Sequence, residues 1–250
     1  MSAFFSALTF FSRFPVPAAL ARVPLVEAAA MAPLAGVLIA LPGAVLLYLA
    51  AQLGASPILA ASIGTVAVII VTGALHEDGL ADCADGFWGG ASPERRLEIM
   101  RDSRIGTFGV LALVAAVLLK VGALQTAIAE SPLRGALTLM AAAIAARAVA
   151  LYPWVGLLPA RADGLAVAVG RPSVRAFRKA LIYGLVATLV LVAWWAPIGV
   201  ILAAIAAAAV AKGCASLAQS KVGGHTGDVI GACVVLADLS YVLALTIWTV

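Results

Sequence analysis

Charged residues are scarce in this chain of 250 residues. Lys, Arg, Asp and Glu make up 11% of it and apolar residues 64%, whereas ordinary soluble domains are about a quarter charged. The polar helix faces that a soluble helical core needs are therefore missing. The composition predicts an all-α fold, a polytopic integral membrane helix bundle, which we expect to form a single domain over residues 1–250.

Cysteine and histidine are also rare. The three cysteines form no CxxC pair and only two histidines are present, so neither a disulfide framework nor a zinc site is expected. The N-terminal segment has no basic residue before Arg13 and carries Pro15 and Pro17, unlike a cleavable signal peptide. We expect it to form a short helix or re-entrant piece at the membrane surface.

About seven apolar stretches have the roughly 20 residues that a helix needs to cross the hydrocarbon core. The block 180–213 is too long for one crossing, and Trp194-Trp195-Ala196-Pro197 interrupts it. Because Pro breaks helical hydrogen bonding and Trp favours interfaces, we expect a tight hairpin there rather than a kink. The expected spans are 28–52, 57–75, 107–129, 132–158, 180–196, 197–213 and 229–249.

Basic residues are distributed unevenly over this topology. Of the 16 Lys and Arg, 13 fall on the side that holds the N-terminal segment and the loops 76–106, 159–179 and 212–228, and the other side has only Arg134. The positive-inside rule places the basic side in the cytoplasm. Membrane topology thus accounts for the net charge of +4, and no nucleic-acid partner is needed to explain it.

Four of the 12 acidic residues lie between positions 77 and 85, directly after the second apolar stretch. In a helix, Asp78, Asp82 and Asp85 fall within about 60° of one another on one face. Three like charges on one face repel each other unless a cation holds them, and an all-oxygen ligand set favours Mg²⁺, a common partner of phosphates. The alternative is a solvated loop whose acids mark the membrane edge.

A second polar segment, 92–109, leads back into the membrane. Ser92 as N-cap, Pro93 in the first turn and Gly106 at the end predict a short amphipathic cytoplasmic helix, whose Glu and Arg residues are typical of a salt-bridged surface. At the re-entry point an acid, a hydroxyl and a guanidinium follow one another, which suits a phosphate or its metal. These residues are Asp102, Ser103 and Arg104.

A third segment, Gly223-Gly224-His225-Thr226-Gly227-Asp228, precedes the last span. Gly-rich backbone that leads into a helix N-terminus is suited to hold an anion. Two simpler alternatives stay open: His225 is a loop histidine without a task, and Asp228 is only the N-cap of the last helix.

Three charged residues lie inside the expected spans, namely Lys120, Arg147 and Asp238. Charges are costly in lipid, so we expect them to face the bundle interior. Pairing of Arg147 with Asp238 is the structural alternative to a functional role, and Lys120 could reach the interface with its long side chain.

The order of these motifs resembles the cobalamin synthase family, the membrane-bound adenosylcobinamide-GDP ribazoletransferases. The resemblance rests on H-x-D-G-L-A-D-x-x-D-G from His76, R-D-S-R-I-G-T-F-G from Arg101 and G-G-H-T-G-D from Gly223, and Thr9-Phe10-Phe11-Ser12-Arg13 is similar to the family's opening element. It implies a phosphotransferase of the bacterial cytoplasmic (inner) membrane. The implied reaction transfers adenosylcobinamide phosphate from adenosylcobinamide-GDP to α-ribazole or its 5′-phosphate, with Mg²⁺ required and GMP leaving, the last step of nucleotide-loop assembly.

The resemblance also implies roles for individual residues. Asp78, Asp82 and Asp85 would bind the metal ion. The proton acceptor stays open between Asp228, His225 and a spare carboxylate such as Asp82. Substrate binding is implied for Arg101, Asp102, Ser103, Arg104, Arg161, Gly224 and Thr226. The expected partners are the two small-molecule substrates and the lipid bilayer, while association with a second copy or with other cobamide-pathway enzymes stays open.

Two other functions fit parts of the pattern. A CDP-alcohol phosphotransferase-like lipid enzyme also builds a metal site from spaced Asp residues on membrane helices, but no Ala-Arg pair follows the acids here. A proton-coupled transporter could use Asp82, Arg147 and Asp238 as a relay, yet the acids gather at one face and no internal repeat is evident.

Overall fold

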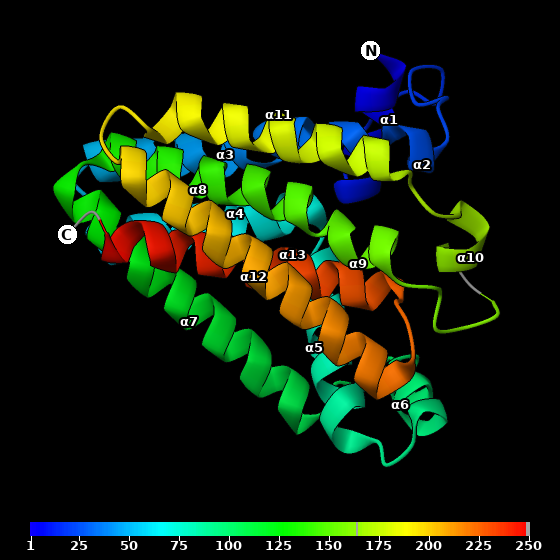
Figure 1. Cartoon of the computed structure of the whole chain (residues 1–250). Coiled ribbons are helices and arrows are strands. Elements are labelled where there is room, and N and C mark those ends of the chain that lie inside the picture. Colours follow the sequence, from blue (N-terminus) through cyan, green and yellow to red (C-terminus); the bar gives the residue numbers. More distant parts are fainter. Residues whose placement is uncertain (164, 249–250) are drawn as a thin grey trace.

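The structure, a computed structural model, describes residues 1–163 and 165–248 (Figure 1). The regular secondary structure of these residues is helical, and the one β-type contact among them is an isolated bridge between Pro159 and His225. The predicted all-α membrane bundle is confirmed. The helices are α1 (Ser2–Phe11), α2 (Leu25–Ala28), η1 (Ala29–Met31), α3 (Ala32–Gln52), α4 (Pro57–Thr72), α5 (Leu75–Gly89), α6 (Pro93–Ile99), α7 (Thr107–Glu130), α8 (Pro132–Val149), α9 (Leu151–Gly156), α10 (Leu165–Val169), α11 (Val174–Val192), α12 (Pro197–Val222) and α13 (Gly227–Ile247).

Local sequence sets where these helices begin and end. A proline lies in the first two positions of α3, α4, α6, α8 and α12, where its missing N–H is not needed. The hydroxyls of Ser92, Ser173 and Thr226 accept backbone N–H groups in the first turns of α6, α11 and α13. Gly223, with a φ of 75°, ends α12 in the left-handed conformation that glycine adopts without strain.

The bundle has a buried centre and a lipid-facing rim. In the most apolar stretch of Pro132–Gly156, 89% of the residues are buried within the protein, against 22% in Thr107–Glu130. α8 and α13 therefore lie inside the bundle, while α7 runs along its edge (Figure 1). The core of α8 is built largely from alanine, which lets neighbouring helices approach closely.

Five helical stretches among the described residues are long and apolar enough to cross a membrane, and six if the bent pair α4–α5 counts as one. The five are Leu25–Gln52, Thr107–Glu130, Pro132–Gly156, Pro197–Val222 and Gly227–Ile247. The predicted hairpin is confirmed, because α11 ends at Val192 and the chain turns back into α12 at Pro197 (Figure 1).

Three expected spans differ from the structure. The span expected at 57–75 corresponds to α4, whose 16 residues qualify only together with α5. α11 is not among the qualifying helices, since three basic residues occupy its first two turns, and the count of seven is therefore not confirmed. α12 runs on to Val222 instead of ending at 213, because a single glycine, Gly213, costs only about 1 kcal/mol inside a helix and no proline follows it before Gly223. The expected end of the last span, residue 249, lies outside the described residues.

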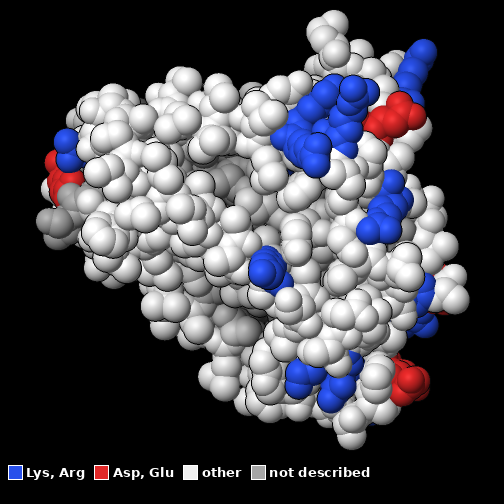
Figure 2. Space-filling model, in the orientation of Figure 1, with Lys and Arg blue, Asp and Glu red and all other residues white. Residues whose placement is uncertain are grey.

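Basic side chains gather at the end of the bundle where α1, α6 and α10 lie (Figures 1 and 2). At the opposite end, Arg134 pairs with Glu130 at 2.8 Å across the α7–α8 turn. The charge asymmetry expected from the sequence is thus present in three dimensions. The predicted N-terminal helix, α1, packs against α3 at the basic end.

The chain bends by 89° between α4 and α5. Gly73 and Ala74 both have a positive φ, of 65° and 57°, and for Ala74 this conformation is unusual and strained. The backbone N–H of Arg13 donates to the carbonyl of Val71 at 2.8 Å. This hydrogen bond satisfies a carbonyl that has no helical partner where α4 ends. The bend directs α5, with its acidic motif, to the basic end of the bundle.

The amphipathic helix is shorter than the sequence suggests. α6 begins at Pro93 as expected but ends at Ile99 rather than near Gly106. The Asp102 carboxylate accepts the backbone N–H of Arg104 at 3.1 Å, a local turn that competes with helix continuation. Met100, just after α6, is buried against α5 at Gly86. A Cβ added at Gly86 would lie 2.9 Å from the carbonyl oxygen of Arg96, so this glycine lets α6 pack closely on α5.

Candidate active site

α5 and α13 cross at glycines. A Cβ added at Gly79 would lie 2.7 Å from the carbonyl oxygen of Asp228, and one added at Gly231 would lie 3.3 Å from the Cα of His76. The two backbones are therefore in direct contact, as small residues permit in membrane bundles. This crossing brings Asp228 beside the helix that carries Asp78 and Asp82.

The Gly-rich loop before α13 is held by a second segment. The N–H of His225 donates to the carbonyl of Leu158 and the N–H of Ala160 donates to the carbonyl of His225, both at 2.9 Å. Gly224 faces the backbone of Leu158 and Ala160 with no room for a side chain. Gly224 thus shapes the loop, and the pairing places Arg161 3.9 Å from the Asp228 carboxylate.

These elements surround a cavity of about 390 Å³ at the basic end of the bundle. Its polar lining comes from α5, the loop after α9 and the start of α13, and its apolar lining from α1, α5 and α13. The residues that line it are Thr9, Phe10, Phe11, Leu75, His76, Asp78, Arg161, Asp163, His225, Thr226, Gly227, Asp228, Ile230 and Gly231.

Asp78 and Asp82 offer free carboxylates. The side chain of neither forms a hydrogen bond or an ion pair with any residue in the described ranges. The contact of Gly79 with the backbone of Asp228 places Asp228 next to the turn of α5 that carries Asp78 and Asp82. Asp78 lines the cavity, and Asp82 follows it one turn along α5 without being among the lining residues. Two unpartnered carboxylates next to a third form a site that attracts a cation.

Asp85 has a different environment. Its two carboxylate oxygens accept the backbone N–H groups of Gly106, at 2.7 Å, and Gly109, at 2.9 Å. Asp85 therefore caps the N-terminus of α7 from a neighbouring helix. Across residues 1–163 and 165–248, no three His, Cys, Asp or Glu side chains are arranged to hold a metal ion, so the expected three-aspartate cluster does not form.

Asp228 lies in the first turn of α13, and Thr226, not Asp228, is the N-cap. The capping alternative for Asp228 is thus wrong. The hydroxyl of Thr226 donates to one Asp228 carboxylate oxygen at 3.1 Å, and Arg161 approaches the same oxygen. The other oxygen stays available to a ligand in the cavity.

His225 is only 1% exposed, and its Nδ1 has no partner among the described residues. Burial lowers the pKa of the imidazole, and the charge of Arg171 lowers it further. A neutral imidazole at physiological pH follows. The backbone of His225 pairs with the 158–160 segment, so the residue shapes the cavity wall whatever its side chain does.

The motif around residue 102 lies outside the cavity. The Arg104 guanidinium binds the Asp102 carboxylate through two nitrogens, at 3.0 and 2.6 Å, and lowers the pKa of Asp102 to about 2. Ser103 is exposed. Arg101 reaches the cavity edge indirectly, because it pairs with Asp163, which lines the cavity, at 2.5 Å.

Two ionisable residues that line the cavity were not among the expected site residues. His76 opens the acidic motif and stacks on Phe11, with ring centroids 5.9 Å apart. Asp163 follows Arg161 in a loop whose fold the sequence does not indicate. The place of His76 at the start of the acidic motif could have predicted that it lies at the site, whereas no sequence pattern points to Asp163.

An apolar helix bundle with a cavity at its basic end that is lined by Asp78, Asp163, Asp228 and Arg161 defines an integral membrane protein with a candidate ligand site. Comparisons with known proteins show the family to which this membrane protein belongs. The chain matches the family model of cobalamin-5-phosphate synthase over residues 3–246, and it belongs to that family.

Similar proteins cover almost the whole chain. A protein from Azorhizobium caulinodans is 45% identical over 97% of this chain and 94% of its own, and one from Sinorhizobium sp. is 41% identical over 96% and 95%. A third, from Rhizobium johnstonii, is 40% identical over 96% and 94%. All three are named adenosylcobinamide-GDP ribazoletransferase. No solved structure gives a significant match. The chain is thus a transferase of cobalamin biosynthesis, and the predicted resemblance is confirmed.

Proposed function

We propose that this protein transfers adenosylcobinamide phosphate from adenosylcobinamide-GDP to α-ribazole or its 5′-phosphate. A hydroxyl oxygen of the acceptor attacks the phosphorus on the cobinamide side of the pyrophosphate. The bond from that phosphorus to the bridging oxygen breaks, and GMP leaves. The names of the relatives support the substrates, and the carboxylates and the Arg161 guanidinium that line the cavity support phosphate chemistry.

The observation that carries this proposal is the pair of unpartnered carboxylates, Asp78 and Asp82, beside Asp228. Mg²⁺ typically binds through one or two protein carboxylates, with water and substrate phosphates completing its shell. Asp78 and Asp82 fit such an ion better than Asp85, because each oxygen of Asp85 already accepts a backbone N–H group. Bound there, Mg²⁺ would neutralise charge on the phosphates.

Asp228 is the proton acceptor in this proposal. It lines the cavity, and one of its carboxylate oxygens is held by Thr226 and Arg161 while the other is free. His225 is buried and serves to shape the loop. A carboxylate fixed at one oxygen can receive the proton of the attacking hydroxyl without moving.

Arg161 binds the leaving GMP. Its guanidinium lines the cavity and donates to the carbonyl of Leu97 at 3.1 Å, which fixes its direction. Its Nε is buried without a partner among the described residues. A guanidinium with a spare donor suits phosphate oxygens. Gly224 and Thr226 contribute by shaping the loop, and Arg101 by holding Asp163.

We place this site on the cytoplasmic side of a bacterial inner membrane. The support is the concentration of basic residues at the same end of the bundle as the cavity (Figure 2), which the positive-inside rule assigns to the cytoplasm.

The test uses the purified full-length protein in lipid nanodiscs. With adenosylcobinamide-GDP, α-ribazole and Mg²⁺, we expect GMP and the cobamide product in equal amounts. EDTA should stop the release of GMP, and excess Mg²⁺ should restore it. Absence of GMP, or release that EDTA leaves unchanged, would overturn the proposal.

A further inference from the structure

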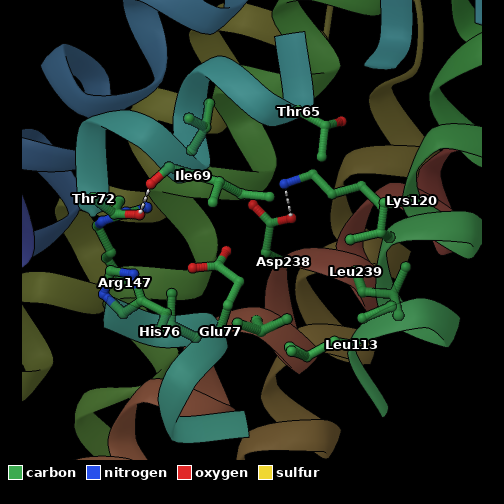
Figure 3. Close-up of a pocket in the computed structure, with 15 residues that line it drawn as sticks. Thr65, Ile69, Thr72, His76, Glu77, Leu113, Lys120, Arg147, Asp238 and Leu239 are labelled. Atoms are coloured by element: carbon green, nitrogen blue, oxygen red, sulfur yellow. Dashed lines mark hydrogen bonds and ion pairs between the residues drawn. The ribbon is translucent and has the colours of Figure 1, made fainter. Parts of the chain in front are cut away.

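A second cavity, of about 40 Å³, lies in the interior of the bundle between α4, α5, α7, α8 and α13. Figure 3 shows five ionisable side chains around it, His76, Glu77, Lys120, Arg147 and Asp238. Lys120 pairs directly with Asp238 at 2.6 Å, so the Arg147–Asp238 pair considered from the sequence does not form. This second cavity is called the inner chamber below.

Several polar atoms around the inner chamber have no partner in the described part of the chain. They are Thr65 Oγ1, His76 Nε2, Glu77 Oε2 and Arg147 Nε, each completely buried. Arg147 satisfies one nitrogen by donating to the carbonyl of Ala143 at 2.9 Å. Unsatisfied polar atoms are costly in a membrane interior, where no bulk water reaches them.

Glu77 and Arg147 face each other across a gap. The charge of each acts on the other, yet no direct ion pair forms between them. In Figure 3 the Glu77 carboxylate points into the space between Arg147 and the Lys120–Asp238 pair. A polar gap of this kind is the usual setting for a bridging water.

The size of the inner chamber agrees with this. A buried water needs about 10–15 Å³ of such volume and two to four polar partners. The 40 Å³ present therefore hold about three waters. The unpartnered atoms supply both donors and acceptors, as a small water cluster requires.

We propose that the inner chamber is a binding site for ordered water that bridges Glu77 to Arg147. This water links the first turn of α5 to α8 just beyond the strained bend at Gly73 and Ala74. Glu77 and Arg147 are thus positioning residues, because they fix the turn of α5 that carries Asp78. The water site stands by itself, and its effect on Asp78 rests on the proposed function.

A double-mutant cycle on thermal unfolding tests the bridge. Glu77→Met and Arg147→Met each leave the other charge buried and unpaired, so each should lower the melting temperature by at least about 5 °C. The double variant should melt closer to wild type than either single one, because no lone charge remains. Additive losses would overturn the proposal. The matched control is the exposed pair Glu130 and Arg134, whose Met variants should change the melting temperature by less than about 2 °C.

A high-resolution cryo-EM map of the wild-type protein in nanodiscs provides a second measurement that needs neither variants nor activity. We expect water density within hydrogen-bond distance of Glu77 Oε2 and Arg147 Nε. A dry chamber, or a side-chain arrangement with a direct Glu77–Arg147 pair, would overturn the proposal. Because this readout is independent of GMP release, it separates failure of the water site from failure of the proposed function.

The positioning role has its own kinetic test. The conservative variant Glu77→Gln keeps oxygen and nitrogen atoms for water, so it should retain GMP release within about threefold, whereas Glu77→Met should lower kcat on the order of tenfold with little change in KM for the acceptor. Equal activity of the two variants would exclude positioning of Asp78 by this water.

Discussion

Gly79 packs directly against the backbone of Asp228. A Cβ at Gly79 would lie 2.7 Å from the carbonyl oxygen and 3.0 Å from the Cα of Asp228, closer than carbon atoms approach. In sequence Gly79 lies between Asp78 and Asp82, so this contact brings carboxylates from two helices together with no side chain between the backbones.

Gly79→Ala should therefore separate α5 from α13 and displace Asp228 from the acidic face. A shift of about 1 Å can cost on the order of 100-fold in rate, and we expect a loss of GMP release of that size. The matched control is Gly122→Ala, at a helical position with nothing within 4 Å of the added carbon. Wild-type turnover in Gly79→Ala would refute the role of this crossing.

Asp85 should prove to be a structural residue and not a metal ligand. Asp85→Ala leaves two backbone N–H groups of α7 without an acceptor, which should destabilise the protein by about 1–3 kcal/mol, measured by denaturation. Asp85→Asn retains one acceptor oxygen and should lose less stability. The Mg²⁺ concentration for half-maximal activity should stay the same in Asp85→Asn. A large increase in that concentration would show that Asp85 is a metal ligand.

Two of the three arginines predicted to bind substrate, Arg161 and Arg104, should differ in their effect on substrate affinity. Arg161 lines the cavity, whereas Arg104 is exposed and paired with Asp102. Loss of a charged hydrogen bond costs about 1.5–3 kcal/mol, so Arg161→Met should raise KM for adenosylcobinamide-GDP by roughly tenfold or more. Arg104→Met should change it by less than about threefold. The reverse order in steady-state kinetics would place the nucleotide at the Asp102 motif instead.

Stability should fall in mild acid because of His225. Burial lowers its pKa in the folded protein, so the unfolded chain, with an ordinary pKa of about 6.5, binds the proton first. The contribution of neutral His225 to the stability of the folded protein is complete above about pH 6.5. It is lost as the pH falls from there toward the lowered pKa of His225 in the folded protein. Between about pH 7.5 and about pH 5.5, His225→Gln should show a smaller drop in melting temperature than wild type. An equal drop in both proteins would contradict this origin.

Much of the fold follows from the sequence, because its signals are local. Proline at helix starts, Ser92 as a cap and the Trp194–Pro197 hairpin all act within a few residues, and each is found as expected. The ends of two helices, α12 and α6, were predicted wrongly. α12 continues past 213 because the single Gly213 is not enough to end a helix, and α6 stops early because the Asp102 carboxylate accepts the backbone N–H of Arg104.

The candidate site was only partly predictable. Periodicity placed Asp78, Asp82 and Asp85 on one face of a helix, but it could not show that backbone N–H groups 21 and 24 positions later occupy Asp85. The pairing of Lys120 rather than Arg147 with Asp238 likewise depends on how α7 and α13 pack. Contacts between distant segments decide both cases, and hydrophobic patterning does not encode them.

The central claim is that Asp78 and Asp82 form the phosphotransfer centre. The most direct measurement is the GMP release rate of Asp78→Asn and Asp82→Asn, each compared with wild type at matched melting temperature. Because neither side chain supports the fold through a hydrogen bond or ion pair in the described ranges, both variants should fold normally and lose activity on the order of 100-fold or more. Near wild-type turnover in either folded variant would contradict the account.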